Sequence, residues 1–314
     1  MTRIALAELP TSRRASRWLR FFEMRLPDGV VPIIPGVLMA WHPGSDPAFW
    51  RCTGAILGFF LLVLLFIHGA DAIIGYVRGV DRIVYNAGGV IKEPKLLVTG
   101  EVRMREALVA VALVAAMMVA LAGYLAITLN RTALVMALAV AAFAAQYSVG
   151  LRLSYRGMGE LVIASTGMLT PVAYIALTGQ VAPAPFLVGA VLGLFFAGVN
   201  LNSNHADYPY DLAAGRGTLA VRIGLPAHRR IGLVIAVLVW SAYVAALVTG
   251  ALPPYAAVGL VLAGRHVQQL RLLYAGDPIA ARTLGFQTLR RLFGVIAVSL
   301  AIRCISAAIG AHTM

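Results

Sequence analysis

The sequence predicts an all-α, polytopic membrane protein with nine transmembrane helices in a single domain, residues 1–314. Hydrophobic residues make up 60% of the chain and charged residues only 12%, against roughly 25% charged residues in an ordinary soluble domain. The mean hydropathy of +0.84 argues against a disordered chain and against a soluble enzyme. The apolar excess extends from about residue 27 to residue 311, so the whole chain is expected to lie in the lipid bilayer.

Nine apolar segments approach the roughly 20 residues that an α-helix needs to cross the hydrocarbon core. The first contains Pro27, Pro32 and Pro35, which predict a kink, and Arg265 interrupts the eighth. Residues 1–26 are basic and lack an apolar core with a cleavage site, so we expect a cytoplasmic, basic amphipathic arm. The expected spans are 27–42, 49–70, 107–129, 132–149, 160–178, 184–204, 231–250, 254–273 and 292–311.

The positions of the cations predict the orientation of these spans. Most of the 26 Lys and Arg residues lie in the arm and in the loops on its side, whereas Arg51 and Arg131 lie on the other side. The positive-inside rule then places the amino terminus in the cytoplasm and the carboxyl terminus outside, as in a multi-pass protein of a bacterial inner membrane. Apolar stretches separate the basic clusters, so the net charge of +13 indicates topology and no nucleic acid partner.

The acidic residues are scarcer and more informative than the basic ones. Of the 13 Asp and Glu residues, only Asp46 is expected on the outer side, so chemistry is expected at the cytoplasmic mouth. The second span ends in HGADAIIGYVRGVDR, and the sixth ends in NLNSNHADYPYDLAAGRGTLAVRIG. The polar residues of these two segments include His68, Asp71, Asp81, Asn204, His205, Asp207 and Asp211.

The second acidic segment predicts a cation site. Asp207 and Asp211 are four residues apart and share one face if the helix continues, although Pro209 could break it between them. Paired carboxylates at the end of a span are costly unless a cation neutralises them, and Mg²⁺ with oxygen ligands is the simplest solution. The alternatives are ordinary solvated loop acids, or a transition-metal site completed by His68 and His205. The expected metal ligands are Asp71, Asp81, Asp207 and Asp211.

Cations lie around both acidic segments in the sequence. Mg²⁺ held by a few carboxylates keeps positions open for phosphate oxygens, and flanking Lys and Arg side chains complete the neutralisation. Acid pairs, cations and an apolar interior together fit a lipid diphosphate. The candidate phosphate-binding cations are Lys95, Arg78, Arg152, Arg156 and Arg216.

These motifs resemble those of the UbiA superfamily of intramembrane prenyltransferases, and the resemblance covers nearly the whole chain. Its most specific parts are YSVGLRLSYRGMGE (Tyr147 to Glu160) and the run from Asn204 through GRGTLAVRIG. Both are similar to the branch that contains 1,4-dihydroxy-2-naphthoate polyprenyltransferase, which serves menaquinone biosynthesis. EPKLLVTGEV (93–102) is similar to the basic stretch after the first acidic motif of that branch, which implies a diphosphate-binding position for Lys95.

The resemblance implies Mg²⁺-dependent transfer of a prenyl group from a polyprenyl diphosphate to an aromatic acceptor within the bilayer. The four aspartates would hold the metal, and Lys95 and Arg152 would neutralise the diphosphate. Tyr147, Tyr155 and Tyr208 would face the allylic cation or, alternatively, belong to an interfacial aromatic belt. The residues expected to bind the diphosphate are Lys95, Arg152, Asn204, Arg156, Arg216 and Tyr147.

The first acidic motif departs from the family pattern. The family has an Asn, an Asp four residues later and a further Asp, and this chain has Asp71, Gly75 and Asp81 at these positions. Either Asp71 replaces the carboxylate that is missing at Gly75 as a Mg²⁺ ligand, or this chain has an altered substrate or weaker catalysis than the family. In the second motif Ser203 and Ala206 replace residues that are usually Asn and Arg.

Other functions are compatible with parts of the pattern. Within the same fold, a terpene cyclase or a prenyltransferase with a non-quinone acceptor would also use these acids. A CDP-alcohol phosphotransferase is disfavoured because its Asp-Gly-x-x-Ala-Arg signature is absent from the sequence. A transporter is less favoured because its substrate site would lie near the middle of the bilayer, where no acidic residue is expected.

Overall fold

The computed structural model describes residues 17–23, 29–86 and 95–312, and the regular elements in these ranges are helices. The predicted all-α class is therefore confirmed for the described residues. The α-helices are α2 (Ile33–Ala40), α3 (Pro47–Val77), α4 (Val80–Asn86), α5 (Leu96–Thr99), α6 (Met104–Thr128), α7 (Arg131–Ala145), α8 (Gly159–Ala164), α9 (Leu169–Thr178), α10 (Pro183–Ala213), α11 (Leu219–Val248), α12 (Leu262–Tyr274) and α13 (Pro278–His312). Short 3₁₀ helices are η2 (Leu153–Arg156), η3 (Ser165–Met168) and η4 (Pro254–Val261).

Six helical segments of the described chain are long and apolar enough to cross a membrane. Each coincides with one of the nine expected spans, so the integral, multi-pass character of the protein is confirmed. One of the six is a composite, in which α8, η3 and α9 follow one another from Gly159 to Thr178. The six segments are Pro47–Val77, Met104–Thr128, Gly159–Thr178, Pro183–Ala213, Leu219–Val248 and Pro278–Gly310.

The other three expected spans coincide with shorter helices and are not confirmed as crossings. Segment 27–42 contains only the eight residues of α2, which begins after Pro32, and its residues 27–28 lie outside the described ranges. Segment 132–149 contains α7, which has 15 residues. Segment 254–273 is divided into η4 and α12, so a tighter 3₁₀ turn precedes the regular helix. These three crossings stay predictions.

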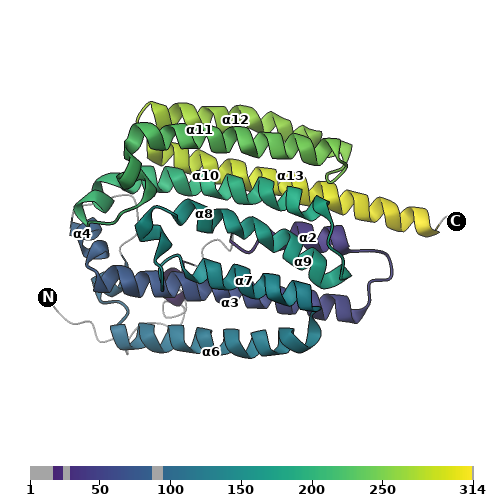
Figure 1. Ribbon diagram of the computed structural model, residues 1–314, viewed down its shortest axis with the longest axis horizontal. Helices are drawn as coiled ribbons and strands as arrows, with labels where there is room; N and C mark the ends of the chain where they lie inside the picture. The colour runs from purple at the N-terminus through teal and green to yellow at the C-terminus, as the bar shows by residue number, and fades with distance from the viewer. Residues whose placement is uncertain (1–16, 24–28, 87–94, 313–314) are drawn as a thin grey trace.

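Helix α10 forms the centre of the bundle (Figure 1). It packs against α11 and α13 on one side and against α8 and α9 on the other, and α3 packs against α6 and α7. Of the six long segments α10 is the most buried and α6 the least. Since a surface that faces lipid is apolar, the exposed apolar side chains of α6 fit contact with lipid.

Glycines allow α10 to approach the composite span very closely. A Cβ atom on Gly193 would lie 2.1 Å from the carbonyl oxygen of Ala164, and one on Gly167 would lie 2.1 Å from that of Gly189. Only residues without a Cβ fit this crossing, as in small-residue interfaces of membrane helices. The crossing brings α8 against the part of α10 that precedes the second acidic motif.

Two helices continue beyond the apolar segments that predicted them. The second span was expected to end at residue 70, but α3 continues to Val77 and therefore includes Asp71. The sixth was expected to end at residue 204, but α10 continues to Ala213 and passes through Pro209. Hydropathy marks where a helix leaves the bilayer and carries no signal for where the helix ends. Asp207 and Asp211 therefore share one face of a continuous helix.

The arm is described only from residue 17 to residue 23, and residues 1–16 and 24–26 of the predicted arm lie outside the described ranges. The rings of Trp18 and Phe22 stack, Phe21 contacts both edge-to-face, and the three pack with Ala72 and Leu96. Arg20 pairs with Glu101, which lies in the short bend between α5 and α6. The described part of the arm is thereby attached to the end of the bundle that carries the acidic motifs.

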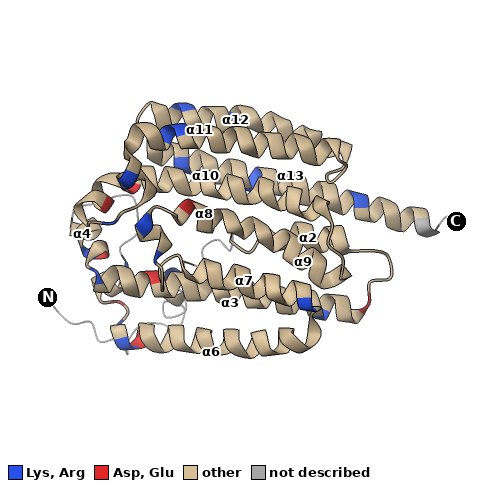
Figure 2. Ribbon diagram, viewed as in Figure 1, with Lys and Arg blue, Asp and Glu red and all other residues tan. Residues whose placement is uncertain are grey.

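The described acidic residues gather at one end of the molecule (Figure 2). They lie at the end that includes α4, together with many of the cations, whereas the opposite end carries Asp46 at the start of α3. The expected asymmetry of the acids is therefore present in the fold, and the candidate site lies at the α4 end.

Candidate functional site

The second acidic motif occupies the last turns of α10. Asp207 and Asp211 are both buried, with 7% and 2% of their surfaces exposed. The Oδ1 atom of Asp211 lies 3.7 Å from a guanidinium nitrogen of Arg216, which follows the end of α10. This arginine is therefore part of the acidic site.

The first acidic motif is divided between α3 and α4. Asp71, in the penultimate turns of α3, accepts a hydrogen bond from the Ser148 hydroxyl. Asp81 lies in the first turn of α4, and its carboxylate lies against the α3 backbone at Gly75. A Cβ atom at Gly75 would be 2.8 Å from Oδ2 of Asp81. The glycine that departs from the family pattern thus leaves room for the neighbouring carboxylate.

Arg216 connects the two motifs electrostatically. Burial alone would lower the pKa of Arg216, but Tyr147, Asp71 and Asp211 stabilise its charge and raise the pKa above its ordinary value. Asp71 belongs to the first motif and Asp211 to the second, so one cation interacts with both. The fold therefore brings together the two acidic segments, which are far apart in the sequence.

The loop between α7 and α8 supplies an aromatic ring at the same place. The guanidinium groups of Arg78 and Arg216 each lie 4.8 Å from the centre of the Tyr155 ring. Burial raises the pKa of the Tyr155 hydroxyl, and the nearby charges of Asp71 and Asp81 raise it further against the opposing effect of Arg216. Tyr155 therefore remains a neutral ring between cations and carboxylates.

Lys95 lies in the basic stretch after the first motif and has a partner that the sequence did not indicate. Its ammonium pairs with Glu23, at the end of the described arm, and the Glu23 carboxylate also lies 3.2 Å from Nδ1 of His68. Burial alone would lower the pKa of Lys95, but Glu23, Asp71 and Asp81 raise it above its ordinary value. Burial would raise the pKa of Glu23, yet Lys95 and His68 hold it well below its ordinary range. Lys95 is thus charged and lies near both first-motif aspartates.

Asn204 and His205 belong to a separate buried cluster beside the second motif. The Asn204 amide donates to Oε1 of Glu160, in the first turn of α8, at 2.7 Å. The same oxygen lies 3.7 Å from Nε2 of His228 on α11, and Nδ1 of His228 lies 3.3 Å from Nδ1 of His205. Helix α11 reaches this cluster after an interruption at Gly224, where φ is 77°. The cluster joins α8, α10 and α11 one turn before Asp207.

Arg152 and Arg156, which were expected to bind the diphosphate, lie at the surface of the segment between α7 and α8. Both are exposed, and within the described ranges Arg156 makes no hydrogen bond or ion pair. Arg152 lies at a groove of about 410 Å³ between the end of α3 and the turn after α7. The groove is lined mainly by apolar residues and is bordered by two guanidinium groups. Its lining residues are Ile73, Ile74, Val77, Arg78, Ser148, Val149, Gly150 and Arg152.

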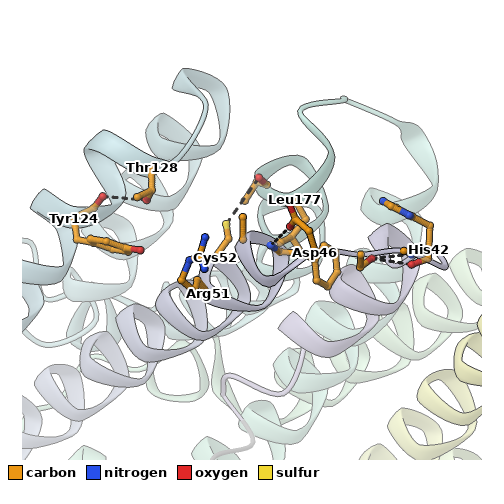
Figure 3. Close-up of a pocket in the computed structure, with 12 residues that line it drawn as sticks. His42, Asp46, Arg51, Cys52, Tyr124, Thr128 and Leu177 are labelled. Carbon is orange, nitrogen blue, oxygen red and sulfur yellow. Dashed lines mark hydrogen bonds between the residues drawn. The ribbon is translucent and has the colours of Figure 1, made fainter.

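A second pocket, of about 600 Å³, lies at the opposite end of the molecule (Figure 3). His42, Asp46 and Arg51 line it with Cys52 and Tyr124. Asp46 accepts a hydrogen bond from the Phe49 amide and so caps α3. None of the predicted site residues lines this pocket, which is distant from the acidic motifs.

The donor set fits Mg²⁺ better than a transition metal. Among the described residues, no three His, Cys, Asp or Glu side chains converge on a point where they could hold a metal ion. His68 and His205 are in separate clusters, with Glu23 and His228 as partners, so the transition-metal alternative gains no support. Mg²⁺ requires no such protein cage, because one or two carboxylates and the phosphate oxygens of a substrate are its usual ligands.

Comparison with known proteins identifies the family. The profile described as "UbiA prenyltransferase family" matches residues 29–308, which is most of the chain. The chain belongs to the UbiA prenyltransferase family. It is therefore an enzyme of this family, as the sequence motifs predicted. Among proteins with curated descriptions, none matches this sequence significantly.

Solved structures share the UbiA fold at low sequence identity. A digeranylgeranylglyceryl phosphate synthase is 14% identical with a TM-score of 0.65, covering 94% of this chain and 99% of that one. The apo UbiA homologue from Aeropyrum pernix K1 is 19% identical with a TM-score of 0.64, covering 88% and 97%. The UbiA homologue from Archaeoglobus fulgidus bound to DMAPP and Mg²⁺ is 16% identical with a TM-score of 0.64, covering 90% and 99%.

Several residues of the candidate site were missed by sequence reasoning. Ser148 and Glu160 lie within the quoted family segment 147–160, so their position in that segment was the available signal. Glu23 and His228 carried none, because each acquires its partner only when distant helices pack together.

Proposed function

We propose that the chain transfers a prenyl group from a polyprenyl diphosphate to an aromatic acceptor, with Mg²⁺ as the cofactor. The observation that carries this proposal is the position of Arg216, which interacts with Asp71 of the first motif and Asp211 of the second. A cation shared by two acidic motifs, with Lys95 beside the first, makes a site that fits a metal diphosphate. Family membership supports the same reaction class.

The aspartates would hold Mg²⁺ in this proposal. Asp207 and Asp211 share one face of α10, and Asp71 and Asp81 lie on α3 and α4. Their oxygens are the donor type that Mg²⁺ prefers. The chemistry that Mg²⁺ supplies when bound is neutralisation of the negative charge that develops on the leaving diphosphate.

Cations and aromatic rings of the chain complete the proposed site. Lys95 and Arg216 would stabilise the diphosphate by charge-assisted hydrogen bonds, with Arg152 and Arg156 attracting it from the exposed loop. As the bond between the prenyl carbon and the diphosphate oxygen breaks, the electron pair stays on the diphosphate. The rings of Tyr147 and Tyr155 would then lie near the allylic cation, which their faces stabilise.

The apolar groove beside α3 is the proposed entry for the prenyl chain. Ile73, Ile74 and Val77 would contact the hydrocarbon, while Arg78 and Arg152 mark the end nearest the diphosphate. Contact with an apolar wall removes hydrocarbon surface from water, which stabilises binding without fixing the length of the chain. The site would open at the cytoplasmic face of a bacterial inner membrane, with the amino terminus inside and the carboxyl terminus outside.

The acceptor in this proposal is a 1,4-dihydroxy-2-naphthoate-like aromatic, which would place the reaction in menaquinone biosynthesis. The support is the similarity of the segments 147–160 and 204–224 to that branch of the family. A ring carbon of the acceptor would attack the allylic cation and then lose its hydrogen as a proton. One carbon–carbon bond forms, and the carbon–oxygen bond to the diphosphate and the carbon–hydrogen bond of the ring break.

The test uses the purified, full-length protein with Mg²⁺ and a long-chain prenyl diphosphate. It is incubated with dihydroxynaphthoate, with hydroxybenzoate and without an acceptor, and prenylated product and released diphosphate are measured. We expect acceptor-dependent product with one of the aromatics. A cyclic hydrocarbon formed without an acceptor would replace this proposal by a terpene cyclase, and absence of both product and diphosphate release would refute it.

The aspartates of α10 provide the variant test of the same proposal. Asp207→Asn and Asp211→Asn each retain the shape of the side chain but lose the charge that binds Mg²⁺. We expect a loss of turnover of at least about 100-fold, as for removal of a principal electrostatic group in other active sites. The thermal unfolding temperature should change little, and Asp277→Asn in the loop before α13 serves as the control. Near wild-type turnover in both α10 variants would contradict the metal role.

A further inference from the structure

Glu160 is a buried carboxylate that the proposed metal and diphosphate sites do not use. It lies in the first turn of α8, where 6% of its surface is exposed. One of its oxygens, Oε1, accepts from Asn204, whereas Oε2 is buried and has no hydrogen-bond partner among the described residues. An unpartnered buried oxygen of this kind costs free energy that a bound hydrogen donor would recover.

The neighbours of Glu160 hold it in place through Oε1 and leave Oε2 without a hydrogen bond. Asn204 donates to Oε1, and Nε2 of His228 lies 3.7 Å from the same oxygen, an ion-pair contact beyond hydrogen-bond distance. Nε2 of His228 is likewise buried without a hydrogen-bond partner in the described part of the chain. Two unpartnered polar atoms therefore lie in one cluster formed by α8, α10 and α11.

The cluster lies beside both acidic motifs. The Tyr147 side chain interacts electrostatically with Glu160, Asp71 and Asp211, and with the Arg216 cation that connects the motifs. Asn204, which holds Glu160, is one helical turn before Asp207 on α10. A molecule bound at Glu160 would consequently be adjacent to the proposed diphosphate.

The chemistry of the unpartnered oxygen restricts its ligand. A carboxylate oxygen can only accept a hydrogen bond, and it repels a phosphate group. It does not lie in a group of three potential metal ligands within the described residues. Its ligand must therefore carry a hydroxyl or amine hydrogen, and the hydroxyl of an aromatic acceptor has this chemistry.

We infer that Glu160 binds the acceptor substrate by accepting a hydrogen bond from its hydroxyl group at Oε2, while Asn204 fixes the carboxylate through Oε1. The inference rests on the proposed prenyl transfer and names the residue that distinguishes hydroxylated acceptors from other aromatics. A hydroxyl group hydrogen-bonded to a carboxylate also donates more electron density to its ring, which favours attack on the allylic cation.

The experiment measures equilibrium binding as well as turnover, so that its outcome does not depend on the transfer reaction. The probes are 1,4-dihydroxy-2-naphthoate and 4-hydroxybenzoate, each paired with its methyl ether, titrated into the full-length protein in detergent. The variant Glu160→Gln keeps an oxygen that can accept from Asn204 but presents an amide donor to the ligand. Glu106→Gln, a carboxylate that caps α6 and pairs with Arg103, is the matched control.

We expect wild-type protein to bind one hydroxylated probe at least tenfold more tightly than its methyl ether, and Glu160→Gln to remove this preference. In turnover assays the variant should raise the KM of the acceptor at least tenfold and leave the KM of the prenyl diphosphate within about twofold. Glu106→Gln should retain the wild-type preference. If Glu160→Gln does not fold, Glu160→Asp, which withdraws the oxygens by one methylene, replaces it.

Three results would overturn the inference. The first is a wild-type protein without any preference for the hydroxylated probes. The second is a variant that retains the preference. The third is an equal rise in the KM values of acceptor, diphosphate and Mg²⁺, which would show that Glu160 acts on the whole site through structure. Absence of transfer with intact hydroxyl-dependent binding would instead contradict only the proposed function.

Discussion

Gly75 gives the Asp81 carboxylate its place against α3. The hydrogen of the glycine leaves space into which both carboxylate oxygens fit, at 2.8 and 2.9 Å from the position of a Cβ atom. The resemblance noted in the sequence implies an aspartate at this position in the family, and in this protein such a side chain would overlap the Asp81 carboxylate. The glycine at position 75 therefore removes one possible ligand and also makes room for the Asp81 carboxylate.

This contact predicts that Gly75→Ala separates stability from activity. Alanine in a helix stabilises it by up to about 1 kcal/mol relative to glycine, and the atom it displaces is the end of a flexible side chain. We expect an unchanged or slightly higher unfolding temperature but a fall of about tenfold in kcat/KM, because Asp81 moves from its position.

The control for this prediction is Gly54→Ala in the same helix, where a Cβ atom would meet nothing within 4 Å. This variant should keep full activity. Gly75→Asp should be no better than Gly75→Ala, and a gain of activity in Gly75→Asp would show that the protein merely lacks a ligand.

At the residue scale, the sequence indicated candidates where the chemistry is carried by residue type. Asp71, Asp81, Asp207 and Asp211 were singled out because acids are rare in this apolar chain, and the structure brings the motifs that contain them to one end of the bundle. Their role as metal ligands stays a prediction. The partners of these residues were not identifiable. Glu23 reaches Lys95 across 72 residues, and Asn204 reaches Glu160 across 44, contacts that only the packing of helices creates.

At the scale of elements, the crossing between α10 and the composite span controls how closely the two halves of the bundle approach. The glycines at this crossing bring backbone against backbone, so no side-chain movement can relieve an added atom. The same crossing determines where α8, and with it Glu160, lies along α10.

We predict that Gly193→Ala destabilises the protein by about 1–3 kcal/mol, since the new Cβ atom overlaps the carbonyl oxygen of Ala164. Thermal unfolding in detergent measures this effect. Gly294→Ala on α13, where a Cβ atom would meet nothing within 4 Å, is the control and should be neutral or stabilising. Equal unfolding temperatures for both variants would contradict the packing argument.

Element boundaries were harder to predict than element types. The apolar segments correctly identified six helices, but three further segments coincide with helices of 8 to 15 residues or with a 3₁₀ helix followed by an α-helix. Prolines explain part of this difference, because α2 starts after Pro32 and η4 starts at Pro254. Pro209, by contrast, does not end its helix, because α10 continues through it and keeps Asp207 and Asp211 on one face.

At the scale of the molecule, the unequal charge of the two ends predicts how the protein lies in its membrane. The end with the acidic motifs also carries the arm and many of the cations, so the positive-inside rule assigns it to the cytoplasm (Figure 2). The pocket lined by His42 and Arg51 would then open on the outer side (Figure 3).

This orientation is testable by labelling single cysteines in intact cells. In a protein with Cys52→Ala and Cys304→Ala, a membrane-impermeant maleimide should label His42→Cys without cell lysis. Ala275→Cys, in the turn between α12 and α13, should react only after the membrane is opened. The reverse pattern would invert the proposed topology.

The position of the acidic motifs at one end of an apolar bundle has a consequence for the reversibility of the proposed reaction. The diphosphate released there is soluble in water and insoluble in hydrocarbon, whereas the prenylated product has the opposite solubility. The two products therefore leave into different phases, one into the aqueous compartment and one into the membrane. The reverse reaction needs the diphosphate and the prenylated product at the same site, so their separation into two phases favours the forward transfer.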